Sequence, residues 1–310
     1  MNTQHQHHQK IIGLIGTVTK DYITFEAGPK LKNQNRIGIG GVLYQAAALC
    51  GMGNQVRLIT QIGEELLPEF RAAAGFWKSL LTEAIYPVPG PGNQVHLHYP
   101  AAGEREEILT SVVPPLTAKQ IIPFLSGLDI LILVLNSGFD ISLQDWKAAL
   151  KHMDCPVWLD MHSLVLAKKI GNPREYVPFP EWQEWVEGVS YLQANKKELA
   201  SALGDPEKFC GKAEILAFSR AAFDQNVDAV FITLGREGVM ALTPGDSRKI
   251  QATPAGEVVD TTGCGDVFCA AAVNALVKGR DCFAAAEAGV KLATRAAETA
   301  GVEEIYYLAG

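Results

Sequence analysis

Residues 258–273 read V-V-D-T-T-G-C-G-D-V-F-C-A-A-A-V, an apolar pair followed by a polar turn with two glycines and a run of small apolar residues. The small residues predict a tightly packed helix over residues 266–277. Glycine allows a sharp turn, so Gly263 and Gly265 bring several backbone N–H groups to one side, where the positive end of the helix dipole adds to them. The segment therefore predicts a pocket for an anion at the start of the helix.

Asp266 lies in the first turn of this expected helix, beside the predicted anion pocket. A carboxylate in that place suits a general base, which takes the proton of an alcohol while a phosphoryl group is transferred to its oxygen. The N–H groups of Gly263, Cys264, Gly265 and Asp266 would then stabilise the charge on the transferred group. The alternative is a purely structural turn in which Asp266 only caps the helix.

Apolar runs of strand length alternate with segments of helical periodicity along the chain. Strands are predicted at residues 11–15, 56–62, 129–135, 157–160, 189–192 and 230–234, and helices at residues 43–51, 66–80, 143–152, 215–223 and 282–299. Strands that are apolar on both faces and alternate with helices are typical of a mostly parallel sheet with helices on both faces. The predicted fold class is α/β, in a chain that ends in two alanine-rich helices.

Residues 21–39 and 94–113 alternate polar with apolar residues instead. Half-polar strands do not fit inside a sheet that is buried on both faces, so we expect them to form a small β flap, or lid, outside it. A turn signal at residues 101–103 predicts a hairpin in the second stretch. Since no internal repeat or interdomain linker is found, residues 1–310 are expected to form one domain, with residues 1–10 as a disordered polar leader.

The composition limits the class of protein and the kinds of partner that can be expected. The 310 residues carry 27 Lys and Arg against 34 Asp and Glu, a formal charge of −7, and 48% are hydrophobic. A packed globular protein is expected, and the lack of a Lys/Arg run disfavours nucleic acid or an anionic membrane as the main partner. The longest apolar run is too short to cross a membrane. Six cysteines without paired spacing predict reduced thiols in a cytoplasmic protein.

The run D-T-T-G-C-G-D, residues 260–266, closely resembles the D-T-x-G-A-G-D signature of ribokinase-like (PfkB) carbohydrate kinases, with Cys264 in place of Ala. The resemblance continues in the family's order through I-G-G-V-L-Y-Q at residues 39–45, Y-L-Q-A-N-K-K-E-L at 191–199 and V-F-I-T-L-G-R-E-G-V at 230–239. It implies a ribokinase-like fold and an ATP-dependent transfer of the γ-phosphate to a hydroxyl group of a small sugar-like alcohol.

The resemblance also implies roles for individual residues. It implies substrate contacts at Asp21, Gly40, Gly41, Asn136 and Gln45, of which Gln45 replaces the family's usual Asn, so that its contact to a hydroxyl group is longer or lost. It implies contacts to the phosphates and, through water, to Mg²⁺ at Asn195 and Glu198, an Asp near the metal at Asp160, and nucleotide contacts at Thr233, Gly235 and Gly238. Finally, it implies K⁺ beside the anion turn at Asp260 and Thr262, and a homodimer formed through the lid.

Two alternatives stay open for the function. Tyr44 and Gln45 alter the substrate helix, which favours a nucleoside or another non-sugar alcohol as the acceptor of a kinase of the same superfamily. A non-catalytic sugar or nucleotide sensor on this fold is disfavoured because Asp266 and its flanking glycines are retained. A dehydrogenase is disfavoured too, because Gly51-Met52-Gly53 is followed by Val56 where G-x-G-x-x-G needs a third glycine.

Overall fold

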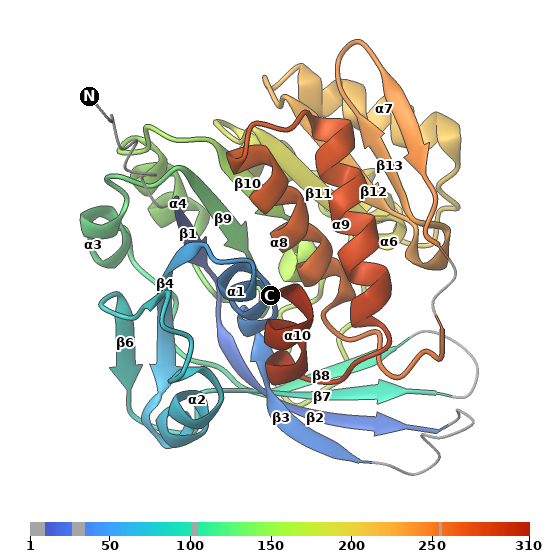
Figure 1. The fold of residues 1–310 in the computed structure, drawn as a ribbon. Helices are drawn as coiled ribbons and strands as arrows, with labels where there is room; N and C mark the ends of the chain where they lie inside the picture. The colour runs from blue at the N-terminus through green and yellow to red at the C-terminus, as the bar shows by residue number, and fades with distance from the viewer. Residues whose placement is uncertain (1–9, 27–34, 101–104, 254–255) are drawn as a thin grey trace, which may run out of the picture.

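The computed structural model describes residues 10–26, 35–100, 105–253 and 256–310, which form two sheets (Figure 1). In order across the large sheet, its strands are β14 (Ser247–Ile250), β13 (Val239–Leu242), β12 (Ala229–Thr233), β11 (Tyr191–Asn195), β10 (Val157–Asp160), β9 (Ile130–Val134), β1 (Ile11–Ile15), β4 (Gln55–Gly63) and β5 (Leu80–Leu81), with β6 (Ile85–Val88) also paired to β4. All strands from β12 to β5 run parallel, as does β6, and β13 and β14 add an antiparallel edge. Every residue of β9 is buried, as expected for a strand covered on both faces.

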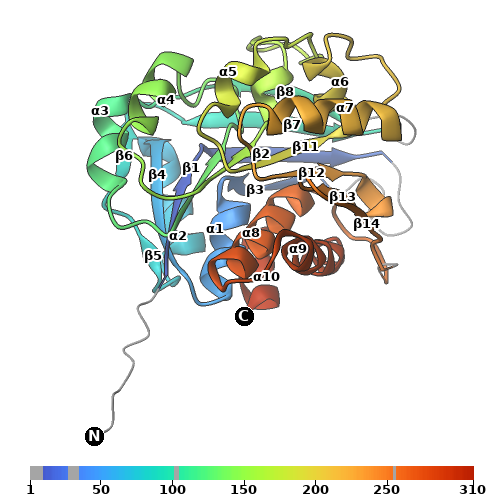
Figure 2. The same cartoon turned by 90° about the horizontal axis from the view of Figure 1, so that it is seen from above.

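Helices cover both faces of the large sheet (Figure 2). One face carries α1 (Leu43–Gly51), α2 (Leu67–Ala74), α8 (Cys264–Val277), α9 (Cys282–Ala296) and α10 (Val302–Ala309). The other carries α3 (Ala118–Ile121), α4 (Leu143–Leu150), α5 (Trp182–Val186), α6 (Lys196–Ala202) and α7 (Lys212–Phe223). The prediction of a mostly parallel sheet between two helical layers is thus confirmed.

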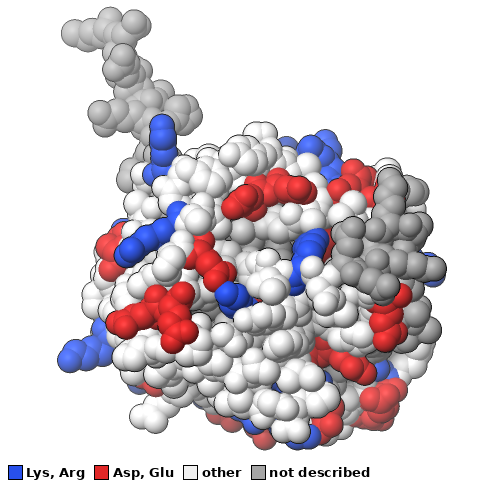
Figure 3. Space-filling view, turned by 90° about the horizontal axis from the view of Figure 1, so that it is seen from below, with Lys and Arg blue, Asp and Glu red and all other residues white. Residues whose placement is uncertain are grey.

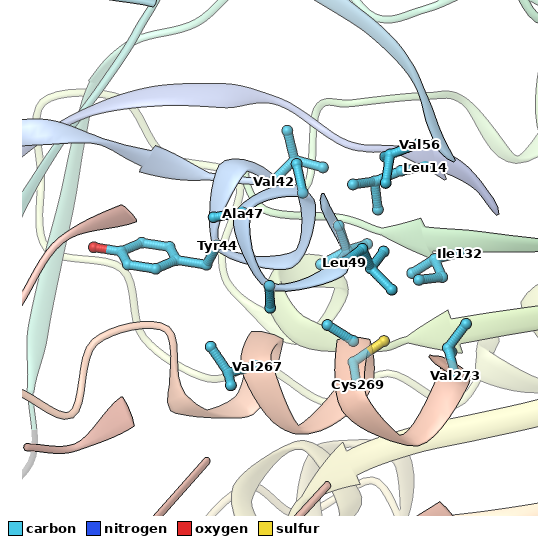
Figure 4. Close-up of a cluster of buried hydrophobic side chains, with 14 of the residues drawn as sticks. Leu14, Val42, Tyr44, Ala47, Leu49, Val56, Ile132, Val267, Cys269 and Val273 are labelled. Atoms are coloured by element: carbon cyan, nitrogen blue, oxygen red, sulfur yellow. The ribbon is translucent and has the colours of Figure 1, made fainter. Parts of the chain in front are cut away.

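Helices α1 and α8 pack against each other on the first face (Figure 4). The inner turns of α1 present fully buried alanines at residues 46–48, while Leu49 lies near Ile132 of β9. Val267 and Cys269 of α8 fill the space beneath α1. Because small side chains let helix backbones approach closely, the first turns of α1 and α8 are held side by side.

The lid is a separate sheet of four strands, in the order β3 (Arg36–Gly41), β2 (Val18–Phe25), β7 (Asn93–Tyr99) and β8 (Glu106–Ser111). Strand β2 pairs antiparallel with β3 and parallel with β7, and β7 pairs antiparallel with β8. Alternate side chains form a small core of their own from Ile23, Phe25, Val95, Leu97 and Leu109. The predicted lid is confirmed, whereas the turn at residues 101–103 and leader residues 1–9 lie outside the described residues.

Several predicted elements were wrong in extent. The helix predicted over residues 66–80 ends at Ala74, where the N–H of Gly75 closes the last turn on the carbonyl of Arg71, and Leu80 pairs with β4 as part of β5. The strand predicted at residues 189–192 begins at Tyr191 and continues to Asn195. The alanine-rich helix predicted to reach residue 299 ends at Ala296, and a third helix, α10, follows it.

The predicted helix was too long because the apolar side chain of Trp77 continues the helical periodicity beyond Ala74. Trp77 is buried, yet it lies in the loop after the helix and stacks on Tyr306 of α10, with ring centroids 5.6 Å apart. A local periodicity cannot distinguish a side chain buried by its own helix from one buried by a helix more than 200 residues away.

The charges on the lid side of the molecule are mixed. Figure 3 shows lysine, arginine, aspartate and glutamate side chains interspersed over this face, with no continuous basic surface. Within the parts of the chain that the structure describes, no helix is both long enough and apolar enough to cross a membrane.

Candidate active site

Polar side chains gather at the carboxyl edge of the large sheet, under the lid. Asn136 follows β9, Asp160 ends β10, Asn195 ends β11 and Thr233 ends β12. The carboxyl ends of parallel strands share one edge, which is where ligands bind in open α/β sheets. The start of α8 lies at the same edge, because Gln193 of β11 donates from Nε2 to the carbonyl of Gly265 at 3.2 Å.

Four neighbouring cavities occupy this region. The lid pocket, of about 50 Å³, is lined by Thr19, Asp21, Gly41, Tyr44, Val95, Leu97, Arg105, Glu107, Leu109, Asn136, His162, Thr262, Gly263 and Asp266. The central pocket, of about 210 Å³, includes Arg105, Asp160, His162, Gln193, Asn195, Glu198, Thr233, Gly263 and Asp266. The polar pocket, of about 470 Å³, includes Arg105, Arg174, Asn195, Lys196, Lys197, Thr233 and Gly235. The apolar pocket, of about 400 Å³, includes Thr233, Gly235, Gly238, Ala252, Val258, Phe268, Val290, Ala293 and Ala297.

These cavities form a continuous series, because neighbours share lining residues. Gly263 and Asp266 line both the lid pocket and the central pocket. Thr233 lines the central, polar and apolar pockets. A molecule in the lid pocket and a longer molecule running through the other three would therefore meet at Asp266.

The turn before α8 has the backbone that its glycines predict. Gly263 is left-handed, with φ of 79°, and a Cβ there would overlap the ring of Tyr44. The amides of Gly263 and Gly265 have no acceptor among the described residues, whereas that of Cys264 donates to the carbonyl of Thr261 at 3.3 Å. Burial raises the pKa of the Cys264 thiol to about 12, so this side chain stays neutral. Two free amides at a helix start form a site suited to an anion.

Asp266 is 8% exposed, and burial raises the pKa of its carboxyl group to about 7. The positive charge of Arg105 and a hydrogen bond from Gln45 act against this rise. A carboxyl group that titrates near neutral pH accepts a proton readily and is still ionised in a large fraction of molecules. Its environment therefore suits a general base better than a helix cap.

In the lid pocket, Asp21 lies on β2 and is 3% exposed. It accepts a hydrogen bond from Thr19 Oγ1 at 2.5 Å, and burial raises its pKa to about 7. A Cβ at Gly40 would overlap the Asp21 carboxylate, which explains the need for glycine there. Asn136 Oδ1 accepts from the N–H of Thr17 at 3.3 Å, so its amide nitrogen is left for a ligand. Together they can bind hydroxyl groups.

Asn195 and Glu198 contact each other at the start of α6. The side chain of Asn195 accepts from the N–H of Glu198 at 2.9 Å, and Glu198 accepts from the N–H of Asn195 at 2.8 Å and from its Nδ2 at 2.6 Å. This reciprocal capping box is in itself structural. Glu198 also faces the central pocket, where burial raises its pKa to about 8.

Burial raises the pKa of Asp160 well above its usual value as well, and the charge of Glu198 adds to this effect. Two buried carboxyl groups in one cavity fit a divalent cation, which would favour their ionised forms. Among the residues that the structure describes, no three His, Cys, Asp or Glu side chains could together hold a metal ion directly. Contacts through water, as the resemblance implies for Mg²⁺, agree with this arrangement.

Asp260 and Thr262, the residues implied for K⁺, already have partners. Asp260 is 3% exposed and pairs with Arg36 Nη2 of the lid at 2.5 Å, while its other oxygen accepts from the N–H of Thr262 at 2.8 Å. The hydroxyl of Thr262 is hydrogen-bonded to Tyr99 at 2.6 Å. This donor set does not fit a cation without displacing the guanidinium of Arg36.

Arg105 and His162, to which the sequence analysis assigned no role, also line the site. Arg105 precedes β8 and lines the lid, central and polar pockets, and its charge acts on the carboxyl groups of Asp21, Glu198 and Asp266. His162 follows β10 and has a φ of 36°. Burial and the positive charges of Arg105 and Arg174 lower the pKa of its imidazole to about 3, so the side chain is neutral. The turn signal at residues 101–103 does not predict where the side chain of Arg105 lies.

Comparison with known proteins identifies the family of the chain. The model of the pfkB family carbohydrate kinases matches residues 137–306, more than half of the chain. A nucleoside kinase from Methanocaldococcus jannaschii is 32% identical over 98 residues, which cover 32% of this chain and only 29% of that protein. The structure of Arabidopsis thaliana ribokinase complexed with ribose and ATP has a TM-score of 0.73 and 20% identity, over 97% of this chain and 99% of that one.

A pyrophosphate-dependent kinase in the ribokinase family has a similar fold, with a TM-score of 0.76 and 16% identity, over 94% of this chain and 96% of that one. The likeness to these structures confirms the predicted ribokinase-like fold with its lid. The family match includes the turn before α8, Asp266 and the strand ends of β11 and β12. The chain therefore belongs to the pfkB family of carbohydrate kinases.

Proposed function

We propose that the protein transfers the γ-phosphoryl group of ATP to a hydroxyl group of a small polyhydroxylated acceptor, with Asp266 as the general base. The observation that carries this proposal is that Asp266 and Gly263 line both the lid pocket and the central pocket. An acceptor bound to Asp21 and Asn136 would thus meet the phosphates of a donor at the base and at the free amides of the turn.

In the transfer, Asp266 takes the proton of the acceptor hydroxyl as its oxygen bonds to the γ-phosphorus. The bond from phosphorus to the bridging oxygen breaks, ADP leaves, and the proton stays on Asp266. The amides of Gly263 and Gly265 and the guanidinium of Arg105 stabilise the charge on the transferred group. Mg²⁺, held through water by Glu198 and Asn195, would supply further positive charge to the donor phosphates.

ATP is favoured as the donor because the polar pocket, with Lys196 and Lys197, continues into the apolar pocket. Pyrophosphate would use the first and leave the second empty. With a panel of pentoses, hexoses, inositols and nucleosides, we expect at least one acceptor to be phosphorylated with ATP at more than ten times the rate with pyrophosphate. Product formation measured by mass spectrometry tests this, and an equal or faster rate with pyrophosphate would show that the donor assignment is wrong.

The acceptor class rests on the lid pocket. The side chains of Asp21 and Asn136 favour a sugar or another small polyol. A nucleoside is the second candidate, because Tyr44 and Val95 give the pocket an apolar wall on which a base could pack. The panel above distinguishes the two, since nucleosides are among its members.

Asp21→Ala is expected to raise the KM of the acceptor about 10- to 100-fold while leaving ATP binding unchanged. The substitution leaves hydroxyl groups of the bound acceptor unpaired in a closed pocket, and a hydrogen bond to a charged group contributes about 1.5 to 3 kcal/mol. Steady-state kinetics and calorimetry with ATP test this, with Asp21→Asn as the control that keeps the shape of the side chain. If ATP binding is lost and acceptor binding is kept, the two sites have been assigned the wrong way round.

A further inference from the structure

Gln45 connects α1 to the proposed general base. Its side chain is completely buried, and Nε2 donates to Asp266 Oδ1 at 2.6 Å, across 221 residues of sequence. Hydrogen bonds of this length are typical of pairs in which one partner is charged. The bond lowers the pKa of Asp266, so it favours the ionised form of the carboxylate.

The bond to Asp266 is the only polar contact of the Gln45 head group among the described residues. Oε1 of Gln45 is buried and has no donor within the part of the chain that the structure describes. A buried carbonyl oxygen without a donor is unfavourable for folding, so an apolar side chain would be expected here if packing alone decided the residue. The amide is therefore better explained by what it does for Asp266 than by stability.

The surroundings of Gln45 keep its amide in place. Helix α1 packs against α8, and the preceding residue, Tyr44, lies against Gly263, where a Cβ would overlap its ring (Figure 4). Tyr44 lines the lid pocket, but Gln45 is absent from its lining. Gln45 thus lies behind Asp266 as seen from the acceptor, rather than beside the acceptor.

We propose, on the basis of the function proposed above, that Gln45 is a positioning residue that fixes the Asp266 carboxylate through Oδ1, leaves Oδ2 for the acceptor hydroxyl, and favours the ionised form of the base. A hydrogen bond to the charged form of a group lowers its pKa, and its loss raises that pKa. We expect the hydrogen bond from Gln45 to lower the pKa of Asp266 by about one unit. The free energy of a hydrogen bond to a charged group corresponds to about one to two pKa units.

Other groups around Asp266 also influence its titration. Those that face it or act on it electrostatically are Arg105 before β8, Asp21 of β2, Tyr44 of α1, Glu107 of β8, Asp160 of β10, His162 after it, Glu198 of α6, and Cys264 and Cys269 of α8. Substituting Gln45 changes none of these charges, so a shift in the Asp266 titration reports the loss of the amide.

The first test needs no substrate. We expect the pKa of Asp266, followed by ¹³C NMR of aspartate carboxyl groups in the full-length protein, to rise by about one unit in Gln45→Leu, which matches the size of the side chain. The Asp266→Asn variant assigns the signal by removing it. Gln45→Asn, which keeps the amide on a shorter arm, should give a similar rise and serves if the leucine variant does not fold.

Asn54→Leu is the matched control. Asn54 is also a buried amide between α1 and α8, where it donates to the carbonyl of Leu49 and to Asn274 Oδ1, each at 3.1 Å, but it has no contact with Asp266. This variant should leave the Asp266 titration unchanged. Equal titrations in wild type, Gln45→Leu and Asn54→Leu would overturn the proposal.

Kinetics then separate positioning from substrate contact. In Gln45→Leu, the acid limb of the pH profile of kcat should move up by about one unit and kcat at its plateau should fall about tenfold, while the KM of the acceptor stays within twofold of wild type. A large rise in KM with an unchanged acid limb would mean that Gln45 contacts the acceptor, and would overturn the proposal. If Asp266→Asn itself keeps the wild-type kcat, the proposed function fails, which is a different result.

Discussion

Replacing Asp266 by asparagine is expected to lower kcat by about 10²- to 10⁴-fold, the usual contribution of a positioned general base. Asparagine keeps the shape of the side chain and can still accept the hydrogen bond from Gln45 through its carbonyl oxygen. It cannot take a proton from the acceptor. Steady-state kinetics with saturating ATP, together with ATP binding by calorimetry, should therefore show a loss of kcat with little change in donor affinity.

A structural role for Asp266 predicts a different result. Asn and Asp are almost equally good helix caps, so a cap would tolerate the substitution with nearly unchanged kinetics. Asp281 is the matched control, because its side chain caps α9 by accepting from the N–H of Ala284 at 2.8 Å. We expect Asp281→Asn to keep kcat within twofold of wild type. A similar result for Asp266→Asn would contradict the mechanism proposed here.

The stability of Asp266→Asn gives a further check on this interpretation. The pKa of Asp266 is about 7 in the folded chain, against a usual value of 3.8, so the folded state binds the proton more tightly than the unfolded state. The contribution of Asp266 to the free energy of unfolding is therefore favourable at acid pH and is lost as the pH rises through 7. Because asparagine does not ionise, we expect the free energy of unfolding of the variant at pH 8 to equal or exceed that of wild type. A loss of kcat then cannot result from unfolding.

The pH dependence of wild-type turnover follows from the same titration. Since the base must be ionised to accept a proton, kcat/KM is expected to fall as the pH decreases below about 7.

The part of the site that lies on the large sheet could be predicted from the sequence. The apolar runs at residues 157–160, 189–192 and 230–234 predict buried parallel strands, and the geometry of such a sheet brings their carboxyl ends together. The glycines at residues 263 and 265 likewise predict a turn whose amides point outward, as observed. In these cases the local sequence determines the backbone, and the fold class determines where that backbone lies.

The contacts between distant side chains could not be predicted in this way. The resemblance implies a longer or lost contact to a substrate hydroxyl group at Gln45, whereas its amide reaches Asp266 on another helix. The implied cation ligand Asp260 is paired with Arg36 from the lid. Each of these contacts depends on how the lid or α1 packs against α8, and packing between elements more than 200 residues apart leaves no periodic pattern in the sequence.

Arg105→Ala is expected to lower kcat on the order of 10³-fold, the lower end of the effect of removing an arginine that stabilises a transferred phosphoryl group. Arg105 lines the three cavities that meet at the proposed transfer site. Its side chain is 36% exposed, and it lies 3.5 Å from Glu107, which in turn is paired with Arg174 at 2.9 Å. Glu107 is thus shared by Arg105 and Arg174, and one carboxylate does not neutralise two guanidinium groups.

Two further variants test whether geometry or charge alone accounts for the effect of Arg105. Arg105→Lys keeps the charge but loses the planar guanidinium, so its kcat should lie between those of wild type and Arg105→Ala. Lys20 lies on lid strand β2, where its side chain pairs with Glu69 at 2.5 Å. It does not line the lid, central or polar pocket. Lys20→Ala should therefore leave kcat within twofold of wild type. If Arg105→Ala changes kcat no more than Lys20→Ala does, Arg105 takes no part in the transfer. If it raises only the KM of the acceptor, Arg105 binds the acceptor instead, because a group that acts on the transferred phosphoryl must affect kcat.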